Sequence, residues 1–144
     1  MYKVLIVILS TVLLSACSKG IPPMVDRTHT PCGNKPNCVS TVETREKYML
    51  APFILRSGVT LDQVERVALT LSGAQTAEKT DDYLRIECTS RIMRFVDDLE
   101  LKIEDDHLLV RSESRVGYSD FGVNRRRAAE LREKLNLAGL IFEP

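Results

Sequence analysis

Two adjacent carboxylates, Asp97 and Asp98, are the residues whose types and spacing most suggest catalysis. A carboxylate pair can share a proton or a metal ion only when both side chains face one site. The segment around them has the pattern of a β-strand, in which adjacent side chains point to opposite faces, so this pair cannot form such a dyad. The same alternation separates Ser112 and Ser114 from His107, which leaves no serine–histidine contact in their strand. The sequence therefore assigns no catalytic residue and favours a non-enzymatic protein over an enzyme.

Three consecutive arginines, Arg125, Arg126 and Arg127, lie near the start of the last expected helix. Glu130 follows Arg126 by four residues and Arg127 by three, and side chains at these spacings pair on a helix. Arg125 has no acidic residue at either spacing and lies beside Asn124, at the edge of the expected buried stripe. We therefore expect Arg125 to serve a different purpose from the two arginines that follow it.

Asp97 offers one such purpose, because it falls on the apolar face of its strand, opposite Ser114. A carboxylate on a core face needs polar or charged partners. In a structural interpretation, Arg125 or Asn124 satisfies Asp97 and latches the helix to the sheet. In a functional interpretation, Arg115, Asn124 and Arg125 converge on an anionic ligand. The sequence leaves both interpretations open.

The first 16 residues have the organisation of a secretory leader. Lys3 supplies a positive charge, and the apolar run over residues 4–14 is too short to span a bilayer. The sequence LSAC, which ends at Cys17, resembles a bacterial lipobox and implies cleavage before Cys17 and lipidation of its sulfur. An ordinary signal peptide is the alternative. The resemblance also implies the outer membrane, because Ser18 rather than an aspartate follows the cysteine. We expect a cell-envelope protein that faces the periplasm and reaches the membrane through Cys17.

The chain after residue 16 has 128 residues, with 19 basic and 20 acidic side chains. This length suits one domain, and the balanced charge gives no reason to expect a nucleic-acid partner. Residues 17–30 are polar and contain prolines, which is typical of a tether, and residues 31–144 are expected to form the domain.

Cys32 and Cys38 flank the turn-rich sequence GNKPN, which can bring their Cα atoms within disulfide range. In an oxidising envelope such a pair is usually a bridge. A metal site that adds His29 is the alternative, but it lacks a fourth local ligand. Cys88 lies in a strand-like run and is expected to be a buried free thiol. We predict a Cys32–Cys38 disulfide, and neither a metal ion nor a cofactor.

The elements that position these residues follow from their patterns. Residues 60–73 predict a helix that has a capping box at Thr60 and Gln63 and ends at Gly73. Residues 74–79 and 83–90 predict one hairpin, and residues 94–104 and 107–116 a second. A strand over 52–55 and a closing helix over 120–136, capped by Ser119 or Asp120, complete the order. We expect the α+β class, with an antiparallel sheet of about four to five strands and two helices packed on one face. The expected buried stripe of the closing helix is Phe121, Asn124, Ala128, Leu131 and Leu135.

A two-residue turn at 105–106 would fix the register of the second hairpin. Glu100 then faces Arg111 and Asp98 faces Glu113. We expect these charges to form a cross-strand lattice on the outward face of the sheet, opposite the apolar face.

Three stretches, PCGNKPNCVST, RFVDDLEL and RSESRVGYSDFGVNRRR, closely resemble the bacterial and plastid family catalogued as domain of unknown function 1499. The resemblance spans residues 31–136, nearly the whole chain after the leader. It implies a domain of that family and no particular activity. One departure is visible, because Thr41 follows Ser40 where the family usually has a second serine.

Together these features predict a cell-envelope lipoprotein that binds a partner or a small ligand, such as an anion, without catalysis. A carrier of lipid or another apolar molecule is the first alternative, and an envelope hydrolase or transferase is the second. The candidate residues of the ligand site or structural latch are Asp97, Ser114, Arg115, Asn124 and Arg125.

Overall fold

The computed structural model describes residues 25–142, so the predicted leader and Cys17 lie outside the described residues. Within them the chain forms six strands and two helices, and every strand pairing is antiparallel. This confirms the α+β class, with more strands than the four to five expected. The elements are β1 (Cys38–Ser40), β2 (Phe53–Ile54), α1 (Leu61–Ala68), β3 (Ala74–Lys79), β4 (Tyr83–Thr89), β5 (Val96–Glu104), β6 (His107–Ser114) and α2 (Val123–Leu137).

The sheet has the strand order β1-β6-β5-β4-β3, and β2 also pairs with β6. The short strands β1 and β2 share one edge of β6, since β1 pairs with Arg111–Glu113 and β2 with His107–Leu108. Strand β1 was not predicted, because its three residues lie in the cysteine loop and carry no alternating pattern of their own.

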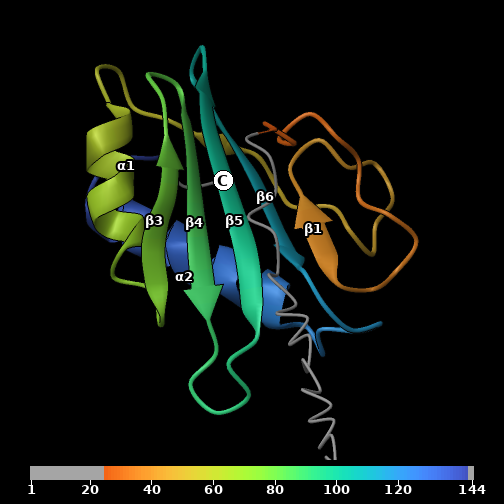
Figure 1. The fold of residues 1–144 in the computed structure, drawn as a ribbon. Coiled ribbons are helices and arrows are strands. Elements are labelled where there is room, and N and C mark those ends of the chain that lie inside the picture. Colours follow the sequence, from red (N-terminus) through yellow and green to blue (C-terminus); the bar gives the residue numbers. More distant parts are fainter. Residues whose placement is uncertain (1–24, 143–144) are drawn as a thin grey trace, which may run out of the picture.

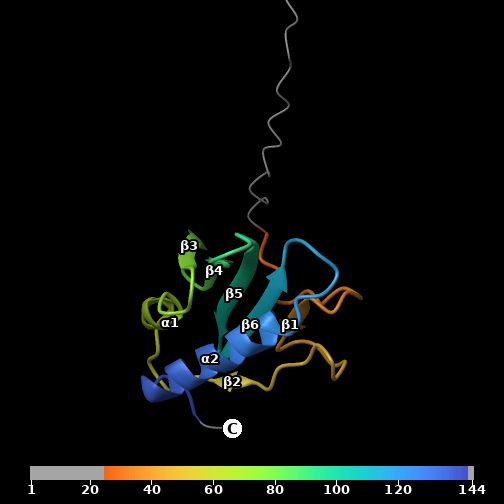
Figure 2. The ribbon, with the colours of Figure 1, turned by 90° about the horizontal axis from the view of Figure 1, so that it is seen from below.

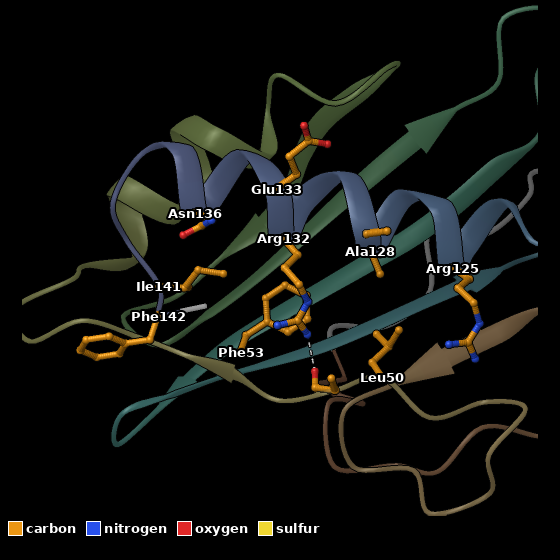
Figure 3. Close-up of a pocket in the computed structure, with 11 residues that line it drawn as sticks. Leu50, Phe53, Arg125, Ala128, Arg132, Glu133, Asn136, Ile141 and Phe142 are labelled. Carbon is orange, nitrogen blue, oxygen red and sulfur yellow. Dashed lines mark hydrogen bonds between the residues drawn. The ribbon is translucent and has the colours of Figure 1, made fainter. Parts of the chain in front are cut away.

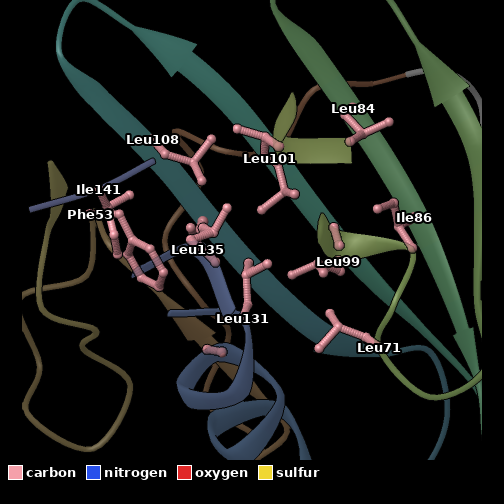
Figure 4. Packing of buried hydrophobic residues seen from close by; sticks show 14 of the residues in the cluster. Phe53, Leu71, Leu84, Ile86, Leu99, Leu101, Leu108, Leu131, Leu135 and Ile141 are labelled. Carbon is pink, nitrogen blue, oxygen red and sulfur yellow. The ribbon is translucent and has the colours of Figure 1, made fainter. Parts of the chain in front are cut away.

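Both helices contribute to one hydrophobic core. Helix α2 runs behind the strands in Figure 1, and Figure 2 shows it crossing beneath β6. It contacts β6, β1 and α1, while α1 also contacts β4. Leu131 and Leu135 of α2 pack in one cluster with Leu99 and Leu101 of β5 and with Phe53 (Figure 4). The predicted stripe of α2 is thus confirmed from Asn124 to Leu135. Within residues 25–142, neither helix combines the length and the apolar character needed to cross a bilayer.

Helix α1 begins as predicted and ends early. The Thr60 hydroxyl accepts from the Gln63 N–H, and the Gln63 side chain accepts from the Thr60 N–H, which completes the capping box. The helix ends at Ala68, five residues before Gly73. Gly73 has a φ of +69° and lies against the Thr89 backbone, so tightly that a Cβ atom would collide with the Thr89 carbonyl oxygen. This glycine therefore allows the chain to pass the end of β4.

The second hairpin has the predicted register. Glu100 pairs with Arg111 and Asp98 with Glu113, across the turn at 105–106. Asp105 takes a φ of 54° in this turn, a left-handed conformation that aspartate tolerates better than most residues.

The charge lattice on this hairpin is buried rather than exposed. Asp98, Glu100 and Arg111 are all nearly inaccessible to solvent. The segment over 25–30, assigned to the tether from its composition, lies across this face and supplies Arg27. The Arg27 guanidinium is 2.6 Å from Glu100 and 2.7 Å from Glu113. Composition alone does not reveal this placement, because the segment is bound by charge and not by an apolar pattern.

Candidate functional site

The polar segment before α2 makes the helix begin later than predicted. Gly122 is the N-cap and the first helical residue is Val123. The Asp120 carboxylate accepts from the backbone N–H groups of Gly122 (2.9 Å) and Asn124 (2.8 Å), so it satisfies donors that the helix leaves unpaired. Phe121 lies before the helix with a φ of 51° and an exposed side chain, so its placement in the buried stripe was wrong.

A latch joins α2 to the sheet, and its cation is Arg127. The Arg127 guanidinium lies 2.6 Å from Asp97 and also donates to Asn124 Oδ1 (2.7 Å) and Ser112 Oγ (3.0 Å). The expectations that Arg125 satisfies Asp97 and that Arg127 pairs with Glu130 were therefore wrong. The sequence spacing indicated this position, because residue 127 is three residues after position 124 and four before position 131, and so borders the buried stripe.

Asn124 is buried and organises the polar contacts around this latch. Its side-chain amide donates to Ser114 Oγ (2.9 Å) and to the Asn37 carbonyl oxygen (3.1 Å). Its Oδ1 atom accepts from Ser112 Oγ at 2.6 Å. Asn124 thus contacts Arg127 and both serines, and it reaches Asp97 only through Arg127.

Arg125 and Arg126 point elsewhere. Arg125 donates to the carbonyl oxygens of Met49 (2.8 Å) and Lys47 (2.9 Å), on the loop that follows β1. Arg126 donates to the Phe121 carbonyl oxygen at 2.9 Å and forms no ion pair with Glu130 in the described part of the chain.

Arg115 lies on the opposite face of the sheet from Asn124. It contacts Asp98 (2.7 Å) and Glu87 (2.6 Å), beside the buried charges under the 25–30 segment. Burial alone would raise the pKa of Asp98, but hydrogen bonds and charge from Arg115 and Arg85 outweigh it and hold that pKa below its usual value. The three residues proposed to converge on an anion, Arg115, Asn124 and Arg125, therefore occupy three separate places.

The hollow beside Arg115 is already neutralised by the protein. It has a volume of about 750 Å³. Its arginines are paired, since Arg85 contacts Asp98 (3.1 Å) and Arg27 contacts Glu113 (2.7 Å). An incoming anion would have to compete with these carboxylates, so this hollow is a poor anion site.

The Cys32–Cys38 disulfide is present, with Cα atoms 5.7 Å apart, which confirms that prediction. Tyr48 packs against it, and its hydroxyl donates to the Asn34 carbonyl oxygen at 2.8 Å. The bridge thus closes the loop that leads into β1. Because both thiols are consumed, the alternative metal site at His29 loses its sulfur ligands.

An apolar groove of about 440 Å³ runs along the outer side of α2. Ala128 and Ala129 leave space on the helix, and Leu50 and Phe53 form the opposite wall. Figure 3 shows Arg125 at one end of the groove and Phe142 at the other, with Arg132 between them. The remaining lining residues are Ala51, Glu133, Asn136 and Ile141.

Arg125 and Arg132 are the cations of this groove, and within residues 25–142 neither forms an ion pair with a carboxylate. Arg132 lies over the Phe53 ring, 3.7 Å from its centroid, and donates to the carbonyl oxygens of Pro52 (2.8 Å) and Ala51. Burial lowers the pKa of Arg132, and no neighbouring acid counters this effect. By contrast, a carboxylate partner is present for Arg27, Arg45, Arg85, Arg111, Arg115 and Arg127.

Sequence reasoning missed Arg132, although a signal was present. Arg132 is seven residues after Arg125, which is two helical turns, so both lie on the same side of α2, about 10 Å apart along its axis. The two alanines fall between them. A pair of arginines that flanks small residues at this spacing indicates a hollow with cations on its wall.

Two catalytic arrangements considered from the sequence can be compared with the described residues. Within 25–142, no group of three histidine, cysteine, aspartate or glutamate residues is placed to hold a metal ion. The Ser112 hydroxyl donates to Asn124, and His107 lies 2.6 Å from Asp106 at the hairpin turn, remote from that serine.

Comparison with known proteins gives one match. The model of a family described as "Protein of unknown function (DUF1499)" matches residues 29–135, well over half of the chain. The matched range contains the disulfide, the whole latch and both arginines of the groove. No curated protein and no solved structure matches the chain.

Proposed function

Since the chain belongs to the DUF1499 family, whose description assigns no activity, we propose a function from the geometry of its groove. The protein is a non-enzymatic binding protein for a small amphipathic anion. The ligand class is an acyl chain that ends in a carboxylate or a phosphate. One observation carries the proposal: Arg125 and Arg132 flank an apolar hollow without a carboxylate partner within residues 25–142.

The two halves of such a ligand match the two kinds of lining. An acyl chain lies against the exposed apolar side chains of the lining, Ala51, Ala129 and Phe142, and each methylene that becomes buried contributes about 0.8 kcal/mol. A guanidinium has five N–H donors, and Arg125 and Arg132 each donate to two carbonyl oxygens. The remaining donors are available to the anionic head group.

The proposal places this binding protein in the cell envelope, held by a lipid on Cys17. The leader-like residues 1–16 and the LSAC sequence support the anchor. A Cys32–Cys38 disulfide is typical of an oxidising compartment, which supports secretion.

Calorimetric titration with dodecanoate, dodecyl phosphate and the uncharged dodecanol tests the proposal. The two anions should bind, and dodecanol should bind at least about tenfold more weakly, because it forms no charge-assisted hydrogen bonds. Arg132→Gln should weaken dodecanoate binding by about tenfold, whereas Arg126→Gln, one of the neighbouring arginines outside the groove, should leave it unchanged.

A second variant tests the groove even if Arg132→Gln fails to fold. Ala129 is exposed in the groove, so Ala129→Leu fills the hollow without entering the core and should abolish binding at an unchanged melting temperature. Equal binding of all three ligands would favour a carrier of apolar molecules, and turnover of the ligand would favour the hydrolase or transferase. Absence of binding by both anions would overturn the proposal.

A further inference from the structure

Two loops expose large apolar side chains to solvent. The β4–β5 loop over 90–95 carries Ile92, which is 89% exposed, together with Met93 and Phe95. The β6–α2 loop over 115–122 carries Phe121, which is 87% exposed, together with Tyr118. Side chains of this size are seldom gathered on loop tips unless they contact a partner.

The two loops leave the same end of the sheet. Strands β4 and β6 end there and β5 begins there, because Thr89 pairs with Val96 and Asp97 pairs with Ser114. The Arg115 N–H donates to the Val96 carbonyl oxygen at 3.4 Å, which joins the bases of the two loops. In Figure 1 both loops lie at the lower end of the molecule, one below β4 and β5 and the other below β6.

The backbone conformation presents these side chains outward at a cost. Phe121 has a φ of 51° and Arg94 a φ of 56°, and bulky side chains rarely adopt this left-handed conformation. The Phe121 N–H is held by Ser119 Oγ at 3.2 Å, and the following turn is held by Asp120. Strain that the fold maintains at an exposed phenylalanine points to a use for that side chain.

The charges at this end are mainly positive. Arg91 and Arg94 lie in the first loop and Arg126 follows the second, and within residues 25–142 none of them forms an ion pair. Asp120, the acid of the second loop, is occupied by the backbone of α2. Aromatic and aliphatic tips surrounded by arginines suit the interface of an anionic bilayer, where rings enter the head-group region and guanidinium groups meet phosphates.

The amino-terminal end of the chain is consistent with this occupant. Val25, the first described residue, lines the hollow that also includes Ser114 and Arg115, at the base of the second loop. Residues 18–24 separate Val25 from Cys17, so even a fully extended segment spans at most about 27 Å. A lipid on Cys17 would therefore keep the domain within that distance of the bilayer and raise the effective concentration of the loops at its surface.

We propose that the 90–95 and 115–122 loops form a membrane-docking surface, which seats the domain on the anionic leaflet that holds its own anchor. The proposal rests on the lipid anchor of the proposed function. The occupant is the lipid bilayer, and the docked orientation is defined by Ile92 and Phe121 entering the interface.

The absence of tryptophan from the chain gives a direct test. Phe121→Trp and Ile92→Trp place a single fluorophore on each loop, and Leu137→Trp places one at the 80% exposed carboxyl-terminal end of α2 as a matched control. Each lipidated protein is reconstituted into vesicles of phosphatidylcholine alone or mixed with phosphatidylglycerol. Brominated lipids should quench the first two tryptophans by about half or more in the anionic vesicles, and they should leave the emission of Leu137→Trp unchanged.

Arg91→Gln combined with Arg94→Gln should reduce this quenching about threefold, as should high salt. Tryptophans at 92 and 121 that remain unquenched in anchored protein would overturn the docking surface. Quenching at all three positions would do so as well, because it would indicate no defined orientation. Failure to incorporate fatty acid at Cys17 would be seen before reconstitution and would count against the anchor itself.

Discussion

The largely buried pair Asp97–Arg127 shows that one arginine of a surface-like charge cluster can belong to the packing of the fold. Arg126 and Arg127 are adjacent and identical, but one lies against solvent and the other contacts Asp97 at 2.6 Å. The difference arises from the helical period alone, which rotates successive residues by about 100°. The three consecutive arginines therefore occupy three different environments.

Removal of Arg127 should be costly, whereas removal of Arg126 should not. Arg127→Ala leaves the Asp97 carboxylate buried without its cation and also removes donors to Ser112 and Asn124. We expect a loss of about 2 kcal/mol or more in the free energy of unfolding, measured by urea denaturation. Arg126→Ala should cost less than about 0.5 kcal/mol.

A double-mutant cycle identifies the partner. Asp97→Asn combined with Arg127→Ala should be less destabilising than the sum of the single changes, because the second change then strands no charge. The same cycle with Arg125→Ala should be additive. Coupling to Arg125 in place of Arg127 would contradict the latch described above.

At the scale of elements, a glycine decides how α1 connects to the sheet. Gly73 combines a positive φ with a close approach to Thr89, whereas Gly58 has a similar φ of +78° and open space around it. An added Cβ atom at Gly58 therefore meets only the penalty of the left-handed conformation, whereas at Gly73 it also collides with the Thr89 backbone.

Gly73→Ala should destabilise the protein by at least about 2 kcal/mol more than Gly58→Ala. The alanine at 58 incurs only the left-handed penalty of about 1 kcal/mol, and the alanine at 73 must also displace the Thr89 backbone. Thermal melts of the two variants measure the difference. Equal melting temperatures would mean that the backbone at Gly73 and Thr89 can move apart without loss of stability.

The hairpins were predictable because local rules decide them. The turn at 105–106 is sufficient to pair Glu100 with Arg111, and Thr60 with Gln63 is sufficient to mark the start of α1. Strand β1 and the segment over 25–30 were not predictable, since both are held by contacts with β6 and with the charged face that are remote in sequence. The candidate groove was missed for the same reason: one wall is α2 and the other is the chain around Phe53, 79 positions before Arg132.

At the scale of the whole molecule, the cysteines test both the fold and the lipid anchor proposed at Cys17. Cys32 and Cys38 are bridged, and Cys88, in strand β4, is buried in the hydrophobic core. Burial raises the pKa of the Cys88 thiol to about 11, so the reactive thiolate is scarce at neutral pH while the protein is folded.

Thiol counting on the processed chain should therefore give no rapidly reacting thiol when folded and one when denatured without reductant. A count of two would mean that Cys17 carries no lipid, and a count of three or more would contradict the disulfide. Cys17→Ser should release the protein from the membrane fraction and leave the denatured count at one.

Cys32→Ser with Cys38→Ser should lower the free energy of unfolding by about 2 kcal/mol, as expected for a short closed loop.

The segment over 25–30 would have a mechanical consequence under the proposed anchor at Cys17, which would hold the protein by its amino-terminal end. Any pull applied there reaches Asp26 and Arg27 before it reaches β1, and so loads the contacts of these two residues with Lys102, Glu100 and Glu113 first. These ion pairs lie across the face of β5 and β6, outside the ladder that joins the strands. Tension would thus detach the segment over 25–30 and expose the carboxylates beneath it to water, while the sheet and its apolar core stay intact. The segment over 25–30 would detach first and so protect the domain from forces transmitted through the proposed anchor.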